Sequence, residues 1–263
     1  MEGGARGTEH RVRLALALDP ATLPTTRHVE TRFDSDREAV VEVEQQRYLA
    51  LTVREAIRPA DPSVAAEVLA AAAAADPARA FGFGPEDERF LARLRWLAAR
   101  RPDLPDLDAL RPGAPSPLLI TLCTGCRSFT DLRRLPLVAT LRGLLGRDAA
   151  QALDRHAPPT LTLPDGTSAR IEYGDPAEPP VVAGRIQQFF GLATTPVVGG
   201  EPVRLHLLAP NNRPAQITSD LASFWANGYQ AVRKDLRGRY PKHPWPDDPL
   251  AATPTGRAKP RGT

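Results

Sequence analysis

Apolar and polar residues alternate along the first sixty positions of the chain. In RVRLALALD (11–19), every second residue is apolar, which is typical of a half-buried strand. The apolar positions in that segment are Val12, Leu14, Leu16 and Leu18. Two further extended segments, HVETRFD (28–34) and EAVVEVEQQRYLALTVREA (38–56), flank the turn-rich DSDRE, which predicts a hairpin. We therefore expect a small antiparallel sheet over residues 11–58.

From Asp61 the apolar spacing changes to that of helices. SVAAEVLAAAAAAD (63–76) is rich in alanine, the residue with the highest helix propensity. PEDERFLARLRWLAARR (85–101) repeats Phe90, Leu94 and Leu97 at helical spacing. TDLRRLPLVATLRGLLG (130–146) continues this periodicity, and Pro136 must start or kink a helix there. The leucines that carry it are Leu132, Leu135, Leu141 and Leu144. DAAQALDRH (148–156) predicts a short helix that ends before Pro158.

The last third of the chain returns to mixed structure. TLTLPDGTSARIEY (160–173) has the period-two pattern of a hairpin around the turn Pro164–Gly166. VVAGRIQQFFG (181–191) suits a short helix closed by Gly191. EPVRLHLLAP (201–210) predicts a strand that buries Val203, Leu205 and Leu207.

These patterns predict an α+β protein with a small antiparallel sheet, a helical middle layer and a C-terminal domain of hairpins and helices. The predicted units are a β-rich part at 1–60, a helical part at 61–157, an α+β domain at 158–249 and a disordered basic tail at 250–263.

One stretch, DLASFWANGYQAVRKDLRGRYPKHPWPDDP (220–249), is dense in aromatic and basic residues. Ser219 as N-cap, Asp220 in the first turn and Gly238 as a stop signal predict a helix. Its apolar residues recur at steps of three and four, so we expect one buried face. That face comprises Leu221, Phe224, Trp225, Tyr229, Val232 and Leu236.

The positive charge of the protein gathers in this last region. The net charge is only +3, and from Asp220 to the end there are eight Lys or Arg against four acidic residues. Clustered cations can neutralise phosphates, and aromatic rings can stack on exposed bases. The expected phosphate contacts are Arg233, Lys234, Arg237, Arg239 and Lys242, with Tyr240 and Trp245 as stacking or docking groups. The competing interpretation is a proline-rich strap that Trp245 pins to the domain.

Other chemistry has weaker support in the sequence. No segment matches the glycine-rich loop, followed by Lys and Ser or Thr, that cradles nucleotide phosphates, so we expect no ATPase site. Cys123 and Cys126 have the spacing of a redox dithiol, but small buried residues are the simpler interpretation. The five histidines are scattered, which predicts neither a metal site nor a catalytic triad. No catalytic residue is predicted.

The composition indicates a soluble protein. With 263 residues, 42% of them hydrophobic and 25% charged, the chain can bury a substantial core. The longest apolar run, AAEVLAAAAAA (65–75), is too short to span a membrane, and the first residues lack the apolar stretch of a secretory signal. We therefore expect a cytoplasmic protein with no membrane partner.

The 220–249 stretch resembles the terminal signature of bacterial HrpB helicases, which are DEAH-type ATP-dependent RNA helicases. The blocks before it resemble the same family in the same order: PTLTLPDGT (159–167), RIQQFFGL (185–192), RLHLLAP (204–210) and RPAQITSDL (213–221). Weaker similarity extends upstream through SFTDLRRLPLVATLRGLL (128–145) and RFLARLRWL (89–97). Gln188 departs from the family, which often has Glu there, and the Cys pair is not characteristic of it.

The resemblance implies that this chain corresponds to the region that follows the motor in such a helicase, and that the motor is absent from it. The family's Walker A, DEAH and arginine motifs do not occur in this sequence, so ATP and magnesium are implied only for a complete helicase. We expect an accessory domain that assists nucleic-acid binding, of RNA above all, or docks helicase motor domains in cis or in trans. The alternatives are a docking scaffold with little nucleic-acid affinity, and a dithiol redox protein acting through Cys123 and Cys126.

Overall fold

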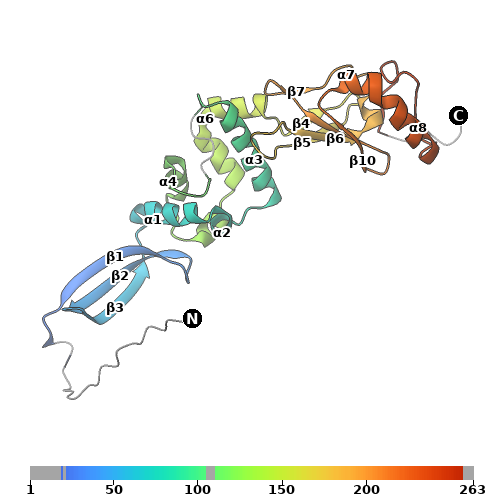
Figure 1. Cartoon of the computed structure of the whole chain (residues 1–263). Helices are drawn as coiled ribbons and strands as arrows, with labels where there is room; N and C mark the ends of the chain where they lie inside the picture. The colour runs from blue at the N-terminus through green and yellow to red at the C-terminus, as the bar shows by residue number, and fades with distance from the viewer. Residues whose placement is uncertain (1–18, 20–21, 105–109, 257–263) are drawn as a thin grey trace, which may run out of the picture.

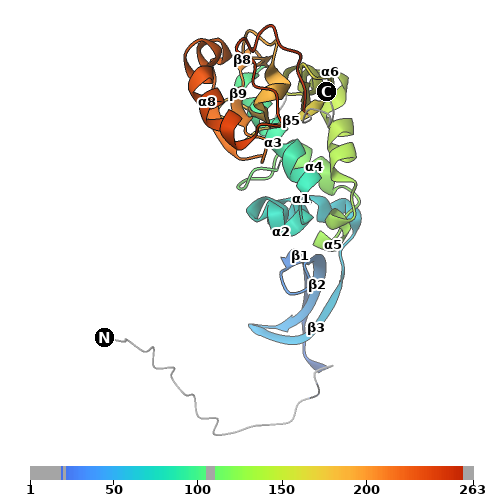
Figure 2. The same cartoon turned by 90° about the vertical axis from the view of Figure 1, so that its right-hand side faces the viewer.

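The computed structural model describes residue 19 and residues 22–104 and 110–256. It confirms the predicted α+β class: a small antiparallel sheet, a layer of helices and a second, mixed sheet follow one another along an elongated molecule (Figures 1 and 2). The strand predicted at 11–19 and much of the predicted tail lie outside the described residues. The predicted boundaries of the units stay a prediction.

The first sheet consists of β1 (Thr26–Asp34), β2 (Ala39–Tyr48) and β3 (Leu51–Pro59) in the order β1-β2-β3. The predicted hairpin around DSDRE is confirmed, and both strand pairs are antiparallel. The continuous extended segment predicted at 38–56 is wrong, because the chain turns at Leu49 and Ala50. Leu49 adopts a left-handed φ of 51°. Leucine rarely adopts this conformation, so its presence in the sequence does not indicate a turn.

Six helices form the middle layer of the described chain. They are α1 (Pro62–Ala75), α2 (Pro77–Phe81), α3 (Pro85–Arg100), α4 (Pro117–Cys123), α5 (Phe129–Arg133) and α6 (Leu137–His156). Four of them carry a proline in their first turn, where no backbone N–H is required. The predicted core positions Phe90, Leu94 and Leu97 are buried.

The segment around Pro136 folds partly as predicted. Pro136 caps the start of α6, and Leu132 and Leu141 are buried. Leu144, which carries the same periodicity, is exposed. The separate helix predicted at 148–156 is confirmed as the second part of α6, because the backbone at Gly146 is not helical, with φ 77° and ψ 172°, and divides α6 into two helical parts.

The second sheet has five strands in the order β10-β9-β6-β5-β4, with the two-stranded hairpin β7-β8 beside it. The strands are β4 (Thr160–Thr162), β5 (Ser168–Glu172), β6 (Val181–Arg185), β7 (Val197–Val198), β8 (Glu201–Pro202), β9 (Arg204–Leu208) and β10 (Pro214–Thr218). The β4-β5 hairpin and the burial of Val203, Leu205 and Leu207 are confirmed. The helix predicted at 181–191 is wrong, because β6 pairs with β5 and β9 before the 3₁₀ turn η2 (Ile186–Phe189).

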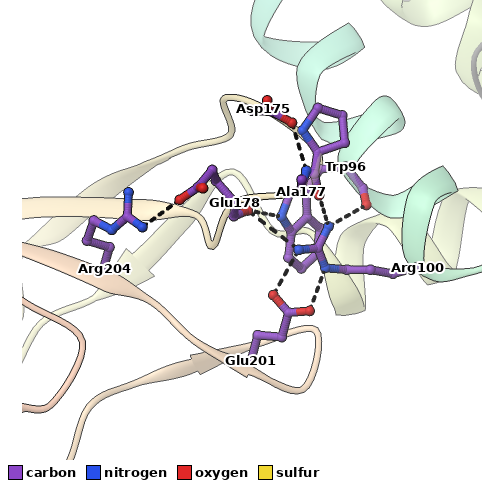
Figure 3. Close-up of polar contacts among 8 residues, drawn as sticks. Trp96, Arg100, Asp175, Ala177, Glu178, Glu201 and Arg204 are labelled. Carbon is purple, nitrogen blue, oxygen red and sulfur yellow. Dashed lines mark hydrogen bonds and ion pairs between the residues drawn. The ribbon is translucent and has the colours of Figure 1, made fainter.

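Two side chains of α3 join the helical layer to the loop before β6 and to the β7-β8 hairpin (Figure 3). Trp96 is fully buried, and its Nε1 donates a hydrogen bond of 3.1 Å to the carbonyl oxygen of Glu178. The Arg100 guanidinium lies 3.8 Å from the centroid of the Trp96 ring. Arg100 also donates two hydrogen bonds, of 2.9 and 2.8 Å, to the carboxylate of Glu201. Arg100 therefore ties α3 to the β7-β8 hairpin beside the second sheet.

No helix in the described parts of the chain is both long and apolar enough to cross a membrane.

Candidate nucleic-acid interface

The aromatic stretch near the C-terminus forms one continuous helical rod of three segments. These are α7 (Leu221–Ser223), a π-helical turn η3 (Phe224–Gly228) and α8 (Tyr229–Arg239). Asp220, not Ser219, is the N-cap, since its carboxylate accepts the backbone N–H of Ser223 at 2.9 Å. Gly238 does not stop the helix, which continues to Arg239.

The apolar face of this rod is buried as the sequence predicts, except at Val232, which is half-buried. Phe224, Trp225 and Tyr229 pack against one another, and Trp225 and Tyr229 also pack against Phe190, with ring centroids 4.9 to 6.3 Å apart. Tyr229 is fully buried, and its hydroxyl donates a hydrogen bond of 3.0 Å to the carbonyl oxygen of Pro246. Burial raises the pKa of this hydroxyl to about 12. These aromatic rings therefore belong to the core, and none of them offers a stacking platform.

A strap of residues 240–249 returns along α8 and is held to it by side chains. Trp245 is only 8% exposed, and its Nε1 donates to the carbonyl oxygen of Tyr240 at 3.0 Å. Arg233 donates from Nε to the carbonyl oxygen of Trp245 at 2.9 Å and pairs with the carboxylate of Asp247. Gln230 donates to the carbonyl of Asp247 at 2.9 Å. Two of the predicted contact residues, Arg233 and Trp245, are thus occupied in fixing the strap.

The other predicted cations point to solvent. Lys234, Arg237, Arg239 and Lys242 are all exposed. Arg239 forms an ion pair with Asp235 one turn earlier at 2.6 Å. Within the described residues, the other three cations make no ion pair within 4.0 Å. Their positive charge is therefore available to an external anion.

An open groove of about 970 Å³ separates the exposed side of α8 from the strap. Its rim carries Lys234 and Arg237 from the helix and His243 from the strap. Tyr240 is half-buried and lies edge-on to His243, with ring centroids 6.5 Å apart. Of the predicted stacking groups, Tyr240 is the one whose ring is partly open to solvent.

Arg185 adds a cation that the sequence analysis missed. It lies at the end of β6, far from α8 in the sequence, and donates to the side chain of Asn212 at 3.2 Å and to the carbonyl of Gly256 at 2.8 Å. The pKa of His243 is lowered, first by burial and then by the charge of Arg185. Only the tertiary fold brings β6 and the strap together, so no local signal in the sequence could have revealed this neighbour.

The two cysteines are small core residues. Both are free and buried in the helical layer. Burial raises the pKa of the Cys123 thiol to about 12 and also raises the pKa of the Cys126 thiol. A redox dithiol needs a lowered thiol pKa and access to its partner, so this environment favours the structural interpretation. In addition, the described residues contain no group of three or more His, Cys, Asp or Glu that could hold a metal ion.

Comparison with known proteins identifies the family of this domain. The family model for the ATP-dependent helicase C-terminal region (HrpB type) matches residues 118–249, which is half of the chain. The chain belongs to the HrpB-type helicase C-terminal family. The matched segment begins in α4 and ends at the close of the strap, so it contains the whole candidate interface.

Two kinds of relatives agree with this assignment to the HrpB-type family. The ATP-dependent RNA helicase HrpB of Escherichia coli strain K12 is 40% identical over 173 residues, which are 65% of this chain and 21% of that protein. The crystal structure of the E. coli DExH-box NTPase HrpB matches with a TM-score of 0.67 and 31% identity over 89% of this chain. A structure of the E. coli DEAH/RHA helicase HrpB matches with a TM-score of 0.57 and 28% identity over 84% of this chain.

The chain spans only part of each HrpB relative. It covers about a fifth of the curated relative, and 30% and 29% of the two solved chains. What the comparisons show is therefore a C-terminal domain of the ATP-dependent helicase HrpB type.

Proposed function

We propose that this chain is an accessory domain of an HrpB-type helicase that binds the phosphate backbone of nucleic acid at the basic side of α8. RNA is the proposed substrate class, because the E. coli relative is an ATP-dependent RNA helicase. ATP and magnesium would be bound by the helicase motor, since the Walker A and DEAH motifs do not occur in this sequence.

The observation that carries this proposal is the difference between paired and unpaired cations on one helix. Arg233 and Arg239 are neutralised by Asp247 and Asp235, whereas Lys234 and Arg237 face solvent on the rim of the groove. An exposed cation without an acidic partner can replace a counterion on a phosphate without first breaking an ion pair. Lys242, at the start of the strap, extends this positive surface.

The chemistry of such a surface is nonspecific. Lysine and arginine side chains contact phosphates whatever the base sequence, and they position the strand without reading it. Tyr240 supplies a partly exposed ring beside these cations, where it can stack on a base. We therefore expect affinity that depends strongly on salt and weakly on sequence.

An RNA titration over a range of potassium chloride concentrations tests the proposal. Fluorescence anisotropy of a labelled single-stranded RNA gives the association constant at each concentration. In the variant Lys234→Gln/Arg237→Gln, we expect weaker binding and a slope of log K against log salt that is shallower by roughly 1.4, since each lost contact to a single strand removes about 0.7.

The matched control is Arg147→Gln/Arg155→Gln, which removes two exposed arginines of α6 and changes the net charge equally. We expect this control to bind RNA like the unaltered chain, because α6 lies away from α8 in the elongated molecule (Figure 1). Equal losses in both variants, or no binding at low salt, would refute a binding surface on α8.

A docking scaffold with little affinity for nucleic acid is the second candidate. The observation that favours it is the use of Arg233 and Trp245 to fix the strap, since much of the family's terminal signature then serves the fold. Absence of RNA binding would favour this candidate. The third candidate, a dithiol redox protein, is disfavoured by the raised pKa values of both buried thiols.

A further inference from the structure

His243 lies on the rim of the groove between α8 and the strap, and the groove leaves its imidazole open to a ligand. The side chain is half-buried. The backbone N–H of His243 donates to the carbonyl oxygen of Tyr240 at 3.1 Å, and the Tyr240 ring lies edge-on beside the imidazole. Among the described residues, neither ring nitrogen of His243 makes a hydrogen bond. The imidazole is therefore held in place by its neighbours, while its polar atoms are available to a molecule in the groove.

The charged groups around His243 are mainly cations, and they come from three elements. Lys234 and Arg237 of α8 line the same groove. Lys242 precedes His243 on the strap and is exposed. Arg185, at the end of β6, lies close enough for its charge to act on the imidazole. A further positive charge on His243 is therefore unfavourable while the groove holds no anion.

No carboxylate of the described residues compensates these cations at the imidazole. Asp247 is the one acidic residue among those that line the groove, and it forms an ion pair with Arg233. Arg185 donates to two uncharged acceptors, the side chain of Asn212 at 3.2 Å and the carbonyl of Gly256 at 2.8 Å. The groove thus has a surplus of positive charge beside a titratable ring.

An anion in the groove would reverse the preference of His243 for its neutral form. Burial and the charge of Arg185 lower the pKa of His243 in the free chain. A phosphate beside the ring would act in the opposite direction, because a neighbouring negative charge favours the protonated imidazole. Protonation also turns both ring nitrogens into N–H donors, which suit the oxygens of a phosphate.

We propose that His243 is a phosphate ligand of this groove and binds a proton when nucleic acid binds. The inference rests on the proposed function, to which it adds a contact residue and a dependence on pH. If the pKa of His243 is higher in the complex than in the free chain, the complex holds more protons between these two values. Affinity then rises as the pH falls through this window, and it is independent of pH above both values.

RNA titrations at several pH values and one low salt concentration test the proposal. The probe is a labelled oligouridylate, whose bases and phosphodiesters keep the same charge between about pH 5 and 8, the range in which histidine titrates. We expect the unaltered chain to bind at least about threefold more tightly at about pH 6 than at about pH 7.5, since one bound proton permits at most about tenfold per pH unit.

Two substitutions of His243 separate the proton from the side chain. His243→Gln keeps a polar group that cannot be protonated in this range, and we expect it to lose the pH dependence. His243→Lys carries a permanent charge, so we expect affinity that is independent of pH and higher than that of His243→Gln throughout. The matched control is His28→Gln, which removes an exposed histidine of β1 at the other end of the molecule and should keep the full pH dependence (Figure 1). Circular dichroism checks that each variant is folded.

Proton NMR of the imidazole measures the pKa of His243 directly and needs no substitution. We expect oligouridylate to raise this pKa. We also expect Arg185→Gln to raise the pKa in the free chain, because the substitution removes one of the two causes of its lowering.

The outcomes distinguish this inference from the proposed function. A pKa of His243 that oligouridylate leaves unchanged, or a pH dependence that persists in His243→Gln, would overturn the role of His243 and leave the phosphate contacts of α8 intact. A pH dependence that His28→Gln abolishes equally would also overturn it, since the proton would then not be bound in the groove. No RNA binding at any pH would refute the proposed function and this inference together.

Discussion

At the scale of single residues, the surroundings of a side chain decide its role more than its type does. Arg233 and Arg237 lie one helical turn apart and are both strong candidates for phosphate contact from the sequence. In the fold, Arg233 is tied to Trp245 and Asp247, while Arg237 faces solvent. The strap thus separates the basic cluster into a structural part and an available part.

Trp245 gives a test of this division. We expect Trp245→Ala to lower the free energy of unfolding by about 3 kcal/mol, because the substitution empties a buried ring site and removes the hydrogen bond to Tyr240. Urea unfolding followed by circular dichroism measures this change. Lys242→Ala, an exposed neighbour on the same strap, should stay within about 0.5 kcal/mol of the unaltered chain. Similar losses in both variants would argue that Trp245 does not anchor the strap.

At the scale of secondary-structure elements, local pattern and long-range pairing compete. The segment 181–191 has the composition of a short helix, but Val182 is fully buried where β6 lies between β5 and β9. Gly184 permits this packing, since a Cβ there would lie 2.7 Å from the ring of Phe189. Pairing with strands distant in sequence therefore outweighs the local preference.

The tight turn between β7 and β8 provides a matched pair of glycines. Gly199 and Gly200 both have a positive φ, of 60° and 94°. A Cβ at Gly199 would lie 2.6 Å from the ring of Trp96, whereas a Cβ at Gly200 would meet no atom within 4 Å. We expect Gly199→Ala to be less stable than Gly200→Ala by roughly 1–3 kcal/mol, the cost of overpacking. Urea unfolding of the two variants measures the difference, and equal stabilities would mean that the turn moves away from Trp96 at no cost.

At the scale of the whole molecule, the first sheet and the candidate interface lie at opposite ends (Figure 1). The sheet β1-β2-β3 lies at one end of the elongated chain, and α8 lies near the other (Figure 1). The helical layer connects them, and Arg100 of α3 contacts the β7-β8 hairpin and stacks on Trp96 at the junction (Figure 3).

Arg100 is therefore the residue at which the contribution of this junction to stability can be tested. Arg100→Ala removes the bidentate contact to Glu201 and the stacking on Trp96, and we expect it to lower the free energy of unfolding by roughly 2 kcal/mol. Arg101→Ala is the control, because Arg101 pairs only with the nearby surface residue Asp103. Urea denaturation compares the two variants, and an Arg100 variant as stable as the control would show that the junction does not depend on this arginine.

The sequence by itself determined the class of this fold and the family to which it belongs. It predicted the hairpin around Asp34–Glu38, the β4–β5 hairpin, the apolar face of the terminal helix and the burial of both cysteines. Each of these follows from residues within a few positions of one another, where the period of the apolar pattern and the chemistry of turns act directly. The terminal signature likewise lies in one continuous stretch.

The tertiary structure alone decided which candidate residues are available for binding. Pairing of β6 with β9, the approach of Arg185 to His243 and the return of the strap over Arg233 join residues far apart in the chain. The turn at Leu49 is also visible only in the structure, since leucine rarely adopts a left-handed backbone conformation and the sequence around it gives no turn signal. The local apolar pattern determines which face of an element is buried. Whether a charged side chain on the other face is covered or exposed depends on how the whole chain packs around it.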